Sequence, residues 1–264
     1  MGSLSDYAEL ELLDHVFNAA YSPAAAVYLA LYESDPGDTD AGTESTYTSY
    51  ARTAITFGAA ASRRVTQNAV VTFPQSTGGS SSVTHWGVHD AATAGNLLAH
   101  GALSETKSVV NGNTPSVASG QAYVEITGEI SDYLANKLLD LMFRNQAYTA
   151  PDTYVSLVTV AATNSMTGST ITEPSGNGFA RKQVNVNGGS SPTWDVAAAG
   201  LVDNTHDITF ATATGSWGTI VGVVIVDAAA TGNLLFYDNG MTDQAVGTDD
   251  VWKFLAGALD ITLS

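Results

Sequence analysis

DAATAGNLL, residues 90–98, returns almost unchanged as DAAATGNLL at residues 227–235. Other stretches recur in the same order: LSDYAELELLDHVF (4–17) as ISDYLANKLLDLMF (130–143), VYLAL (27–31) as TYVSL (153–157), YAR (50–52) as FAR (179–181), VTF (71–73) as ITF (208–210), and ASGQAYVEI (118–126) as LAGALDITL (255–263). An ordered set of matches indicates an internal duplication. Each copy is long enough to bury a core of its own, so we predict two tandem homologous domains, residues 1–128 and 129–264.

Each copy opens with a stretch that predicts one short amphipathic helix. Ser5 or Asp6 is a suitable N-cap in the first copy, and Ser131 or Asp132 in the second. Apolar residues then recur at helical spacing: Leu10, Leu13, Val16 and Phe17, and in the second copy Leu134, Leu138, Leu141 and Met142. Such a stripe has to be covered, most simply by one face or end of a sheet.

The rest of each copy consists of short β-rich segments, such as AAVYLALY (25–32) and TYVSLVTV (153–160), separated by Gly, Asn and Asp. This pattern is typical of antiparallel sandwiches. We therefore predict a mainly β protein built from two antiparallel β-sandwich, jelly-roll-like domains, each preceded by one short α-helix. Residues 33–50 and 161–178 are expected to be long exposed loops, equal in length but different in sequence, as is typical of loops that carry contacts.

The repeated hairpin HWGVHDAATAGNLL (85–98) contains two histidines that suggest a metal site, with a third at position 100. Zinc or nickel bound by imidazole and carboxylate is one interpretation, but positions 85 and 89 lie roughly 13 Å apart along an extended strand. None of the three histidines recurs in the second copy. The residues that recur suit a tight turn, in which an aspartate accepts hydrogen bonds from the turn amides and Gly–Asn adopts left-handed conformations. We therefore predict no metal, and assign a structural turn role to Asp90, Gly95, Asn96, Asp227, Gly232 and Asn233.

Arg52 and Arg181 are retained in both copies, each preceded by an aromatic residue and an alanine, in a chain with only nine Lys plus Arg. One interpretation is a structural arginine that pairs with a carboxylate or caps carbonyl groups. The other is a contact between subunits or domains, for which these two residues are the interface candidates.

The formal net charge of −17 argues against binding to nucleic acid and to anionic membranes, because both require cations on the protein. No apolar stretch reaches the roughly 18 residues of a membrane span, and the N-terminal stretch has no secretory signal pattern. The absence of cysteine excludes disulfides, zinc-thiolate sites and cysteine nucleophiles. The serine-hydrolase elbow, the zinc-protease motif and the Walker loop are absent, and DPGDTDAG (35–42) lacks the glutamate of a calcium loop. We expect neither an enzyme nor a bound cofactor.

The ordered motifs LSDY…LLD, VYLAL…DP, YAR, VTF and GVHDAATAGNLL resemble those of tailed-bacteriophage proteins described as tail-fibre-like or minor virion structural proteins. The resemblance covers nearly the whole chain, once per copy, so this chain is a tandem duplication of the family's usual single unit. It implies a non-enzymatic structural component of the virion, associated with the tail or a fibre or exposed on the particle surface. The implied partners are other virion proteins and copies of the chain itself, in a symmetric trimer or ring. The alternatives are a capsid decoration protein and a carbohydrate-binding module for host surface glycans.

Overall fold

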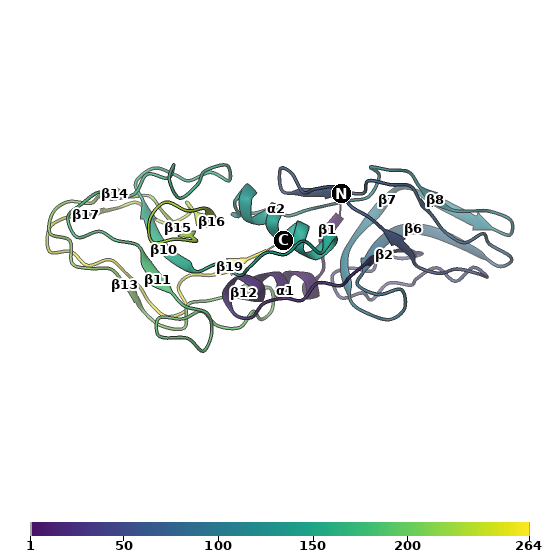
Figure 1. The fold of residues 1–264 in the computed structure, drawn as a ribbon, viewed down its shortest axis with the longest axis horizontal. Helices are drawn as coiled ribbons and strands as arrows, with labels where there is room; N and C mark the ends of the chain where they lie inside the picture. The colour runs from purple at the N-terminus through teal and green to yellow at the C-terminus, as the bar shows by residue number, and fades with distance from the viewer. Residues whose placement is uncertain (1, 264) are drawn as a thin grey trace.

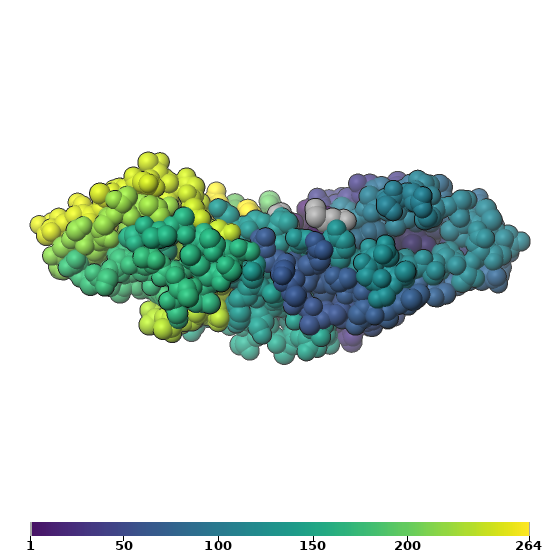
Figure 2. Space-filling model, turned by 90° about the horizontal axis from the view of Figure 1, so that it is seen from above, coloured from purple at the N-terminus to yellow at the C-terminus, as the bar shows by residue number. Residues whose placement is uncertain are grey.

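A computed structural model describes residues 2–263, which form a mainly β protein with one helix at the start of each repeat. Figure 1 shows an elongated molecule in which the β elements of the two repeats lie at opposite ends and the helices lie between them. Seen from above, the surface continues from one repeat into the other (Figure 2). This arrangement confirms the prediction of a mainly β protein of two tandem repeats.

The first repeat contains a helix and nine strands: β1 (Gly2–Leu4), α1 (Asp6–Phe17), β2 (Val27–Tyr32), β3 (Thr53–Ile55), β4 (Arg64–Thr66), β5 (Val71–Thr72), β6 (Ser80–His89), β7 (Leu97–Val110), β8 (Ser116–Val117) and β9 (Tyr123–Glu125). The second contains a helix and ten strands: α2 (Asp132–Arg144), β10 (Thr153–Val158), β11 (Lys182–Val184), β12 (Leu201–Val202), β13 (Ile208–Thr209), β14 (Gly218–Ile220), β15 (Gly222–Val226), β16 (Leu234–Asp238), β17 (Gln244–Val246), β18 (Lys253–Phe254) and β19 (Ile261–Thr262).

Both repeats contain the same four-stranded antiparallel sheet, but the strands that extend it differ between the repeats. The order β3-β2-β6-β7 in the first repeat corresponds to β11-β10-β15-β16 in the second, and all of these neighbours are antiparallel. In the first repeat the sheet continues and curls through β1 and β9 to β4, with β1 parallel to β9. In the second repeat β12 and β19 form a separate pair.

The helix caps explain why both helices begin where they do. Ser5 Oγ accepts a hydrogen bond from Ala8 N at 3.2 Å, and Ser131 Oγ accepts one from Leu134 N at 3.1 Å. Each hydroxyl also donates to a backbone carbonyl of the repeated hairpin, that of Leu97 or Leu234. The serine therefore satisfies a free amide of the first helical turn and fixes the helix to its own sheet.

The far end of each helix packs on the other repeat. Helix α1 lies against β1 and β7 of its own repeat and against β12 of the second, whereas α2 lies against β16 of its own repeat and β4 of the first. This packing across the two repeats is reciprocal, because β4 and β12, which the two helices contact, occupy corresponding places in the two repeats.

Corresponding residues of the two repeats make the same contacts in this packing. Asp14 Oδ1 accepts a hydrogen bond from Ala197 N at 2.7 Å, and Asp140 Oδ1 accepts one from Ala60 N at 2.8 Å. Two edge-to-face aromatic pairs are also related: Phe17 with Trp194, at 4.9 Å between ring centroids, and Phe57 with Phe143, at 5.4 Å. The repeats therefore associate through a pseudo-two-fold interface, in which each uses the same surface.

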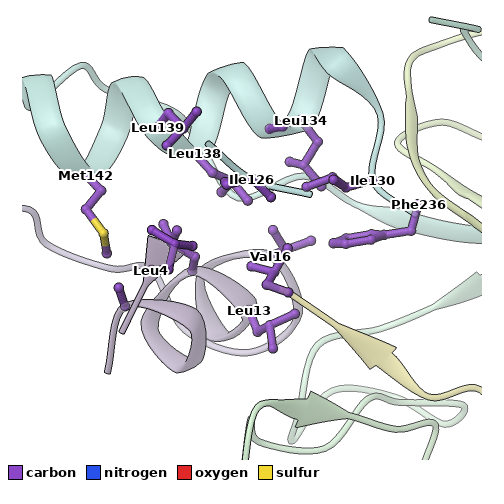
Figure 3. Close-up of a cluster of buried hydrophobic side chains, with 14 of the residues drawn as sticks. Leu4, Leu13, Val16, Ile126, Ile130, Leu134, Leu138, Leu139, Met142 and Phe236 are labelled. Carbon is purple, nitrogen blue, oxygen red and sulfur yellow. The ribbon is translucent and has the colours of Figure 1, made fainter. Parts of the chain in front are cut away.

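The centre of the molecule is a shared apolar core. Leu13 and Val16 of α1 face Leu134 and Leu138 of α2 across Leu4, Ile126, Ile130 and Phe236 (Figure 3). All eight of these side chains except Phe236 are at most 1% exposed. One cluster of buried residues thus includes both repeats, and whether residues 1–128 or 129–264 fold alone stays a prediction.

The prediction that residues 33–50 form a wholly exposed loop is wrong for the second half of that segment. Tyr32 bridges to Glu44, Thr48 bridges to Gly78, and Tyr47 is 2% exposed because it packs in the core. Tyr47 and Tyr50 belong to a segment predicted to be a loop because Pro, Gly and acidic residues fill its first part, residues 33–44. Neither of the helices in residues 2–263 has the length and apolar character of a membrane span.

Candidate functional site

The repeated hairpin turn is held by the same bonds in both repeats. Asp90 accepts from the backbone N of Asn96 at 2.7 Å and from its side-chain amide at 2.8 Å, and Asp227 accepts the same pair of bonds from Asn233, both at 2.6 Å. Gly95, at φ +72°, lies against this carboxylate, since a Cβ there would be 2.3 Å from Asp90 Oδ1. Gly232 has the same environment, with φ +75° and a distance of 2.4 Å. Only glycine suits either position.

Arg52 joins this turn to the long loop of the first repeat. Its guanidinium donates to both oxygens of Glu44, with Nε–Oε1 at 3.0 Å and Nη2–Oε2 at 2.9 Å. Its Nη1 donates to the carbonyl of Ala94 at 2.6 Å, and the side chain is 10% exposed. Burial alone would raise the pKa of Glu44, but hydrogen bonds from Arg52 and Tyr50 lower it below the ordinary value, so the carboxylate is ionised.

Arg181 makes the corresponding contacts, with three backbone carbonyls in place of two, and is 4% exposed. It pairs with Glu173 through Nε–Oε1 at 2.7 Å and Nη2–Oε2 at 3.0 Å. It also donates to the carbonyls of Ala228 at 2.8 Å, Thr231 at 2.7 Å and Gly168 at 2.6 Å. Both candidate interface arginines therefore use their guanidinium groups within their own repeats.

The partners Glu44 and Glu173 were not identified from the sequence. Each lies eight residues before its arginine, inside a loop that otherwise differs between the repeats, and that shared offset was the available signal. The matched aspartates Asp14 and Asp140, which end the two LLD motifs, were also missed although both copies retain them.

The histidines of the first repeat hold the acidic part of its loop against the sheet. His100 Nε2 lies 2.9 Å from Asp38 Oδ1 and its Nδ1 lies 3.6 Å from Asp35, and His85 is 3.8 Å from Asp35. In the second repeat the corresponding positions are Gly222 and Tyr237, so this contact exists once. Within residues 2–263, no group of three or more His, Asp or Glu side chains is arranged to hold a metal ion.

His89 is completely buried and belongs to a hydrogen-bonded chain. Tyr32 donates its hydroxyl proton to Asp40 Oδ1 at 2.5 Å, and His89 Nε2 lies 2.7 Å from the same hydroxyl oxygen. Because that proton is already used, Nε2 must be the donor to Tyr32. This leaves Nδ1 unprotonated and without a hydrogen-bond partner, 4.0 Å from Asp40 Oδ2. Burial, followed by the nearby charge of Arg52, lowers the pKa of His89, so the imidazole is neutral. These bonds fix the loop and place no reactive group in an open cleft.

Glu9 of α1 lies on the other side of the acidic loop. Burial, followed by repulsion from Asp38 and Asp6, raises its pKa from 4.5 to about 7. Its carboxylate also approaches Gly200 of the second repeat. The carboxyl group is therefore partly protonated near neutral pH, at a place where the loop and both repeats meet.

Replacing Glu9 with Gln is expected to stabilise the protein at pH 8 by about 1 kcal/mol, allowing for solvent screening of a half-buried group, and to have little effect at pH 5. Because the folded-state pKa lies above the ordinary value, protonation favours the folded state. This contribution is complete below about pH 4.5 and is lost as the pH rises through 7. Urea unfolding at four pH values between 5 and 8 measures the difference, and the exposed Glu105→Gln is the control. Parallel stability profiles for the wild type and Glu9→Gln would contradict the assignment.

Comparison with known proteins matches the chain to one family twice. The family model of Podophage GP4 fiber I protein gp80 matches residues 3–125 and again residues 129–262. The two matches follow the internal duplication and together cover nearly the whole chain. No curated protein matches the chain. The family is one of structural fibre proteins and not a class of enzyme. The chain therefore belongs to this family of podophage fibre proteins, as a tandem duplication, and is a component of the virion.

Proposed function

We propose that the chain is a non-enzymatic structural part of the tail-fibre apparatus, in which it acts as a stiff two-lobed element joining other virion proteins. The observation that carries the proposal is the double family match, which makes both repeats fibre units. The reciprocal packing of α1 and α2 supports it, because one continuous core resists bending between the lobes.

The bonding within each repeat supports a structural role over a catalytic one. Arg52, Arg181 and the buried His89 all bond to groups of their own repeat. A catalytic assignment would need a nucleophile and a base facing an open cleft. We propose that the six turn residues, from Asp90 to Asn233, serve the same structural purpose.

Immunogold electron microscopy of intact virions with an antibody to this chain tests the location. We expect gold at the tail, on or beside the fibres. Gold spread evenly over the heads would contradict the tail assignment and favour the alternative of a capsid decoration protein. A saturable response on a glycan array would add the third alternative, host glycan binding.

We propose further that the chain assembles as a symmetric oligomer, a trimer or a ring, since closed symmetry is the usual arrangement of repeated structural proteins. Size-exclusion chromatography with light scattering at about 10 µM is expected to give a mass of three or more times the 27.3 kDa of one chain. A monomer at that concentration, with no ring by negative-stain microscopy, would contradict this proposal.

A further inference from the structure

The second repeat contains a cavity beside its last strand. It has a volume of about 370 Å³ and lies between β16 and β19. Its apolar wall is formed by Val223, Phe236, Leu259 and Ile261, each of which is at most 8% exposed. The duplication supplies a built-in comparison, since each wall position has a counterpart in the first repeat.

The corresponding space in the first repeat is filled by protein. There β1 lies between β7 and β9 and pairs with both. The indole of Trp86 covers Gly2 so closely that a Cβ at position 2 would be 2.4 Å from the ring. Trp86 also pairs across the sheet with Gly101, which has no side chain to obstruct the ring. An extended strand and an indole therefore fit this place in the fold.

Two differences open the space in the second repeat. The tryptophan is replaced by Val223, whose cross-strand neighbour is Asp238. The segment that corresponds to β1, residues 128–130, connects the two repeats. It passes through Gly128, at φ +87°, and does not pair with β19 as β1 pairs with β9. That segment bonds to β16, with Tyr237 N donating to the Glu129 carbonyl at 3.0 Å, and the Gly128 carbonyl accepts a hydrogen bond from Arg63 of the first repeat at 3.2 Å. Strand β19 pairs with β12 on one side, and no strand formed by residues 2–263 pairs with its other side.

The rim of the cavity is acidic. Glu129, Asp238 and Asp260 line it, and no basic side chain among residues 2–263 forms an ion pair with any of them. Asp203 lies next to Asp260, and burial followed by this contact raises the pKa of Asp203 to about 6. Like charges held together around an apolar wall favour a cationic ligand.

We propose that this cavity binds an extended segment of a partner protein, with a large aromatic side chain inserted where Trp86 lies in the first repeat and basic residues beside it. The free side of β19 would accept the backbone of that segment by strand addition. The apolar wall would take the aromatic ring, and the three rim carboxylates would pair with the basic residues. This binding site does not depend on whether the chain is placed in the tail or on the head.

The probe is the peptide acetyl-Gly-Lys-Trp-Lys-Gly-amide, titrated into the whole chain by calorimetry and by NMR. We expect saturable binding with amide shifts centred on Val223, Leu259 and Ile261. Replacing the tryptophan of the peptide with alanine, or both lysines with glutamate, is expected to weaken binding at least tenfold. Absence of saturable binding, or equal binding of the tryptophan and alanine peptides, would overturn the proposal.

The matched variant copies the first repeat into the second by combining Val223→Trp with Asp238→Gly. It is expected to fill the cavity and weaken peptide binding at least tenfold without a loss of melting temperature. Asp260→Asn, at an exposed position, is expected to weaken binding severalfold and to reduce its salt dependence, and it serves if the double variant folds poorly. Unchanged affinity in both variants would show that the peptide binds elsewhere. Self-association that the double variant abolishes, without peptide binding, would make a second copy of the chain the occupant.

Discussion

Replacing Arg181 with methionine is expected to lower the free energy of unfolding by about 3–5 kcal/mol, because breaking a buried ion pair leaves the other charge without compensation. The side chain is 4% exposed, and its loss would leave Glu173 with only the Ser156 hydroxyl as donor and three backbone carbonyls without the guanidinium. These groups belong to the loop and the turn, so both should loosen. Urea unfolding followed by circular dichroism measures the change.

Two further variants separate the geometry of Arg181 from its charge. Arg181→Lys keeps the charge but cannot donate to Glu173 and the carbonyls together, so most of the loss should persist. Combining Arg181→Met with Glu173→Gln removes the unpaired charge and should recover part of the stability. If Arg181→Met were as stable as the wild type, the arginine would have no structural role, and the interface interpretation would be favoured.

Replacing Phe17 with alanine is expected to destabilise the whole chain by about 3–5 kcal/mol, the usual cost of deleting a large buried aromatic side chain. Phe17 is completely buried at the end of α1. Its ring contacts two aromatic residues of the other repeat, Trp194 at 4.9 Å and Phe236 at 5.5 Å between centroids. The lost contacts are therefore those that hold the two repeats together.

The four tryptophans make this prediction easy to measure. Trp86 is the tryptophan of the first repeat, and Trp194, Trp217 and Trp252 belong to the second. In a Trp86→Phe background, tryptophan fluorescence reports on the second repeat alone, whereas circular dichroism reports on both repeats. Because the core is shared, we expect Phe17→Ala to move both transitions together by the same amount. A shift confined to one repeat would mean that the repeats unfold independently. Val251→Ala, at an exposed position, is the control.

The elements that were predicted correctly depend on neighbours in the sequence. Ser5 and Ser131 cap the helices because an N-cap needs only the three residues that follow it. The turns at Asp90 and Asp227 lie where the Asp and Gly–Asn pattern places them, since the bonds between aspartate and asparagine span only seven residues. The duplication itself is visible as repeated stretches of residues, and the two segments of the family match coincide with the two copies.

Features that join distant residues were not predictable in the same way. The apolar stripe of α1 is satisfied equally well by its own sheet or by the sheet of the other repeat, so periodicity cannot distinguish them. The packing of each helix on the other repeat depends on three-dimensional contacts, made by Asp14, Asp140 and the aromatic pairs. The histidines suggested a metal site because the sequence does not show that Asp35 and Asp38 fold back onto them.

The sequence by itself thus determined the repeat, the mainly β class, the two capped helices and the hairpin turns. Repeated residues show the first, the pattern of short β-rich segments shows the second, and hydrogen bonds between near neighbours encode the caps and turns. Only the tertiary structure decided which repeat each helix covers, which glutamate each arginine meets, and that one copy closes over Trp86 while the other leaves a cavity at Val223. These outcomes depend on how the loops and distant segments of the chain pack against one another in three dimensions. The two copies of the hairpin, although nearly identical in sequence, therefore have different neighbours. The segment before the second copy's helix connects to the first repeat, whereas the corresponding segment of the first copy forms β1.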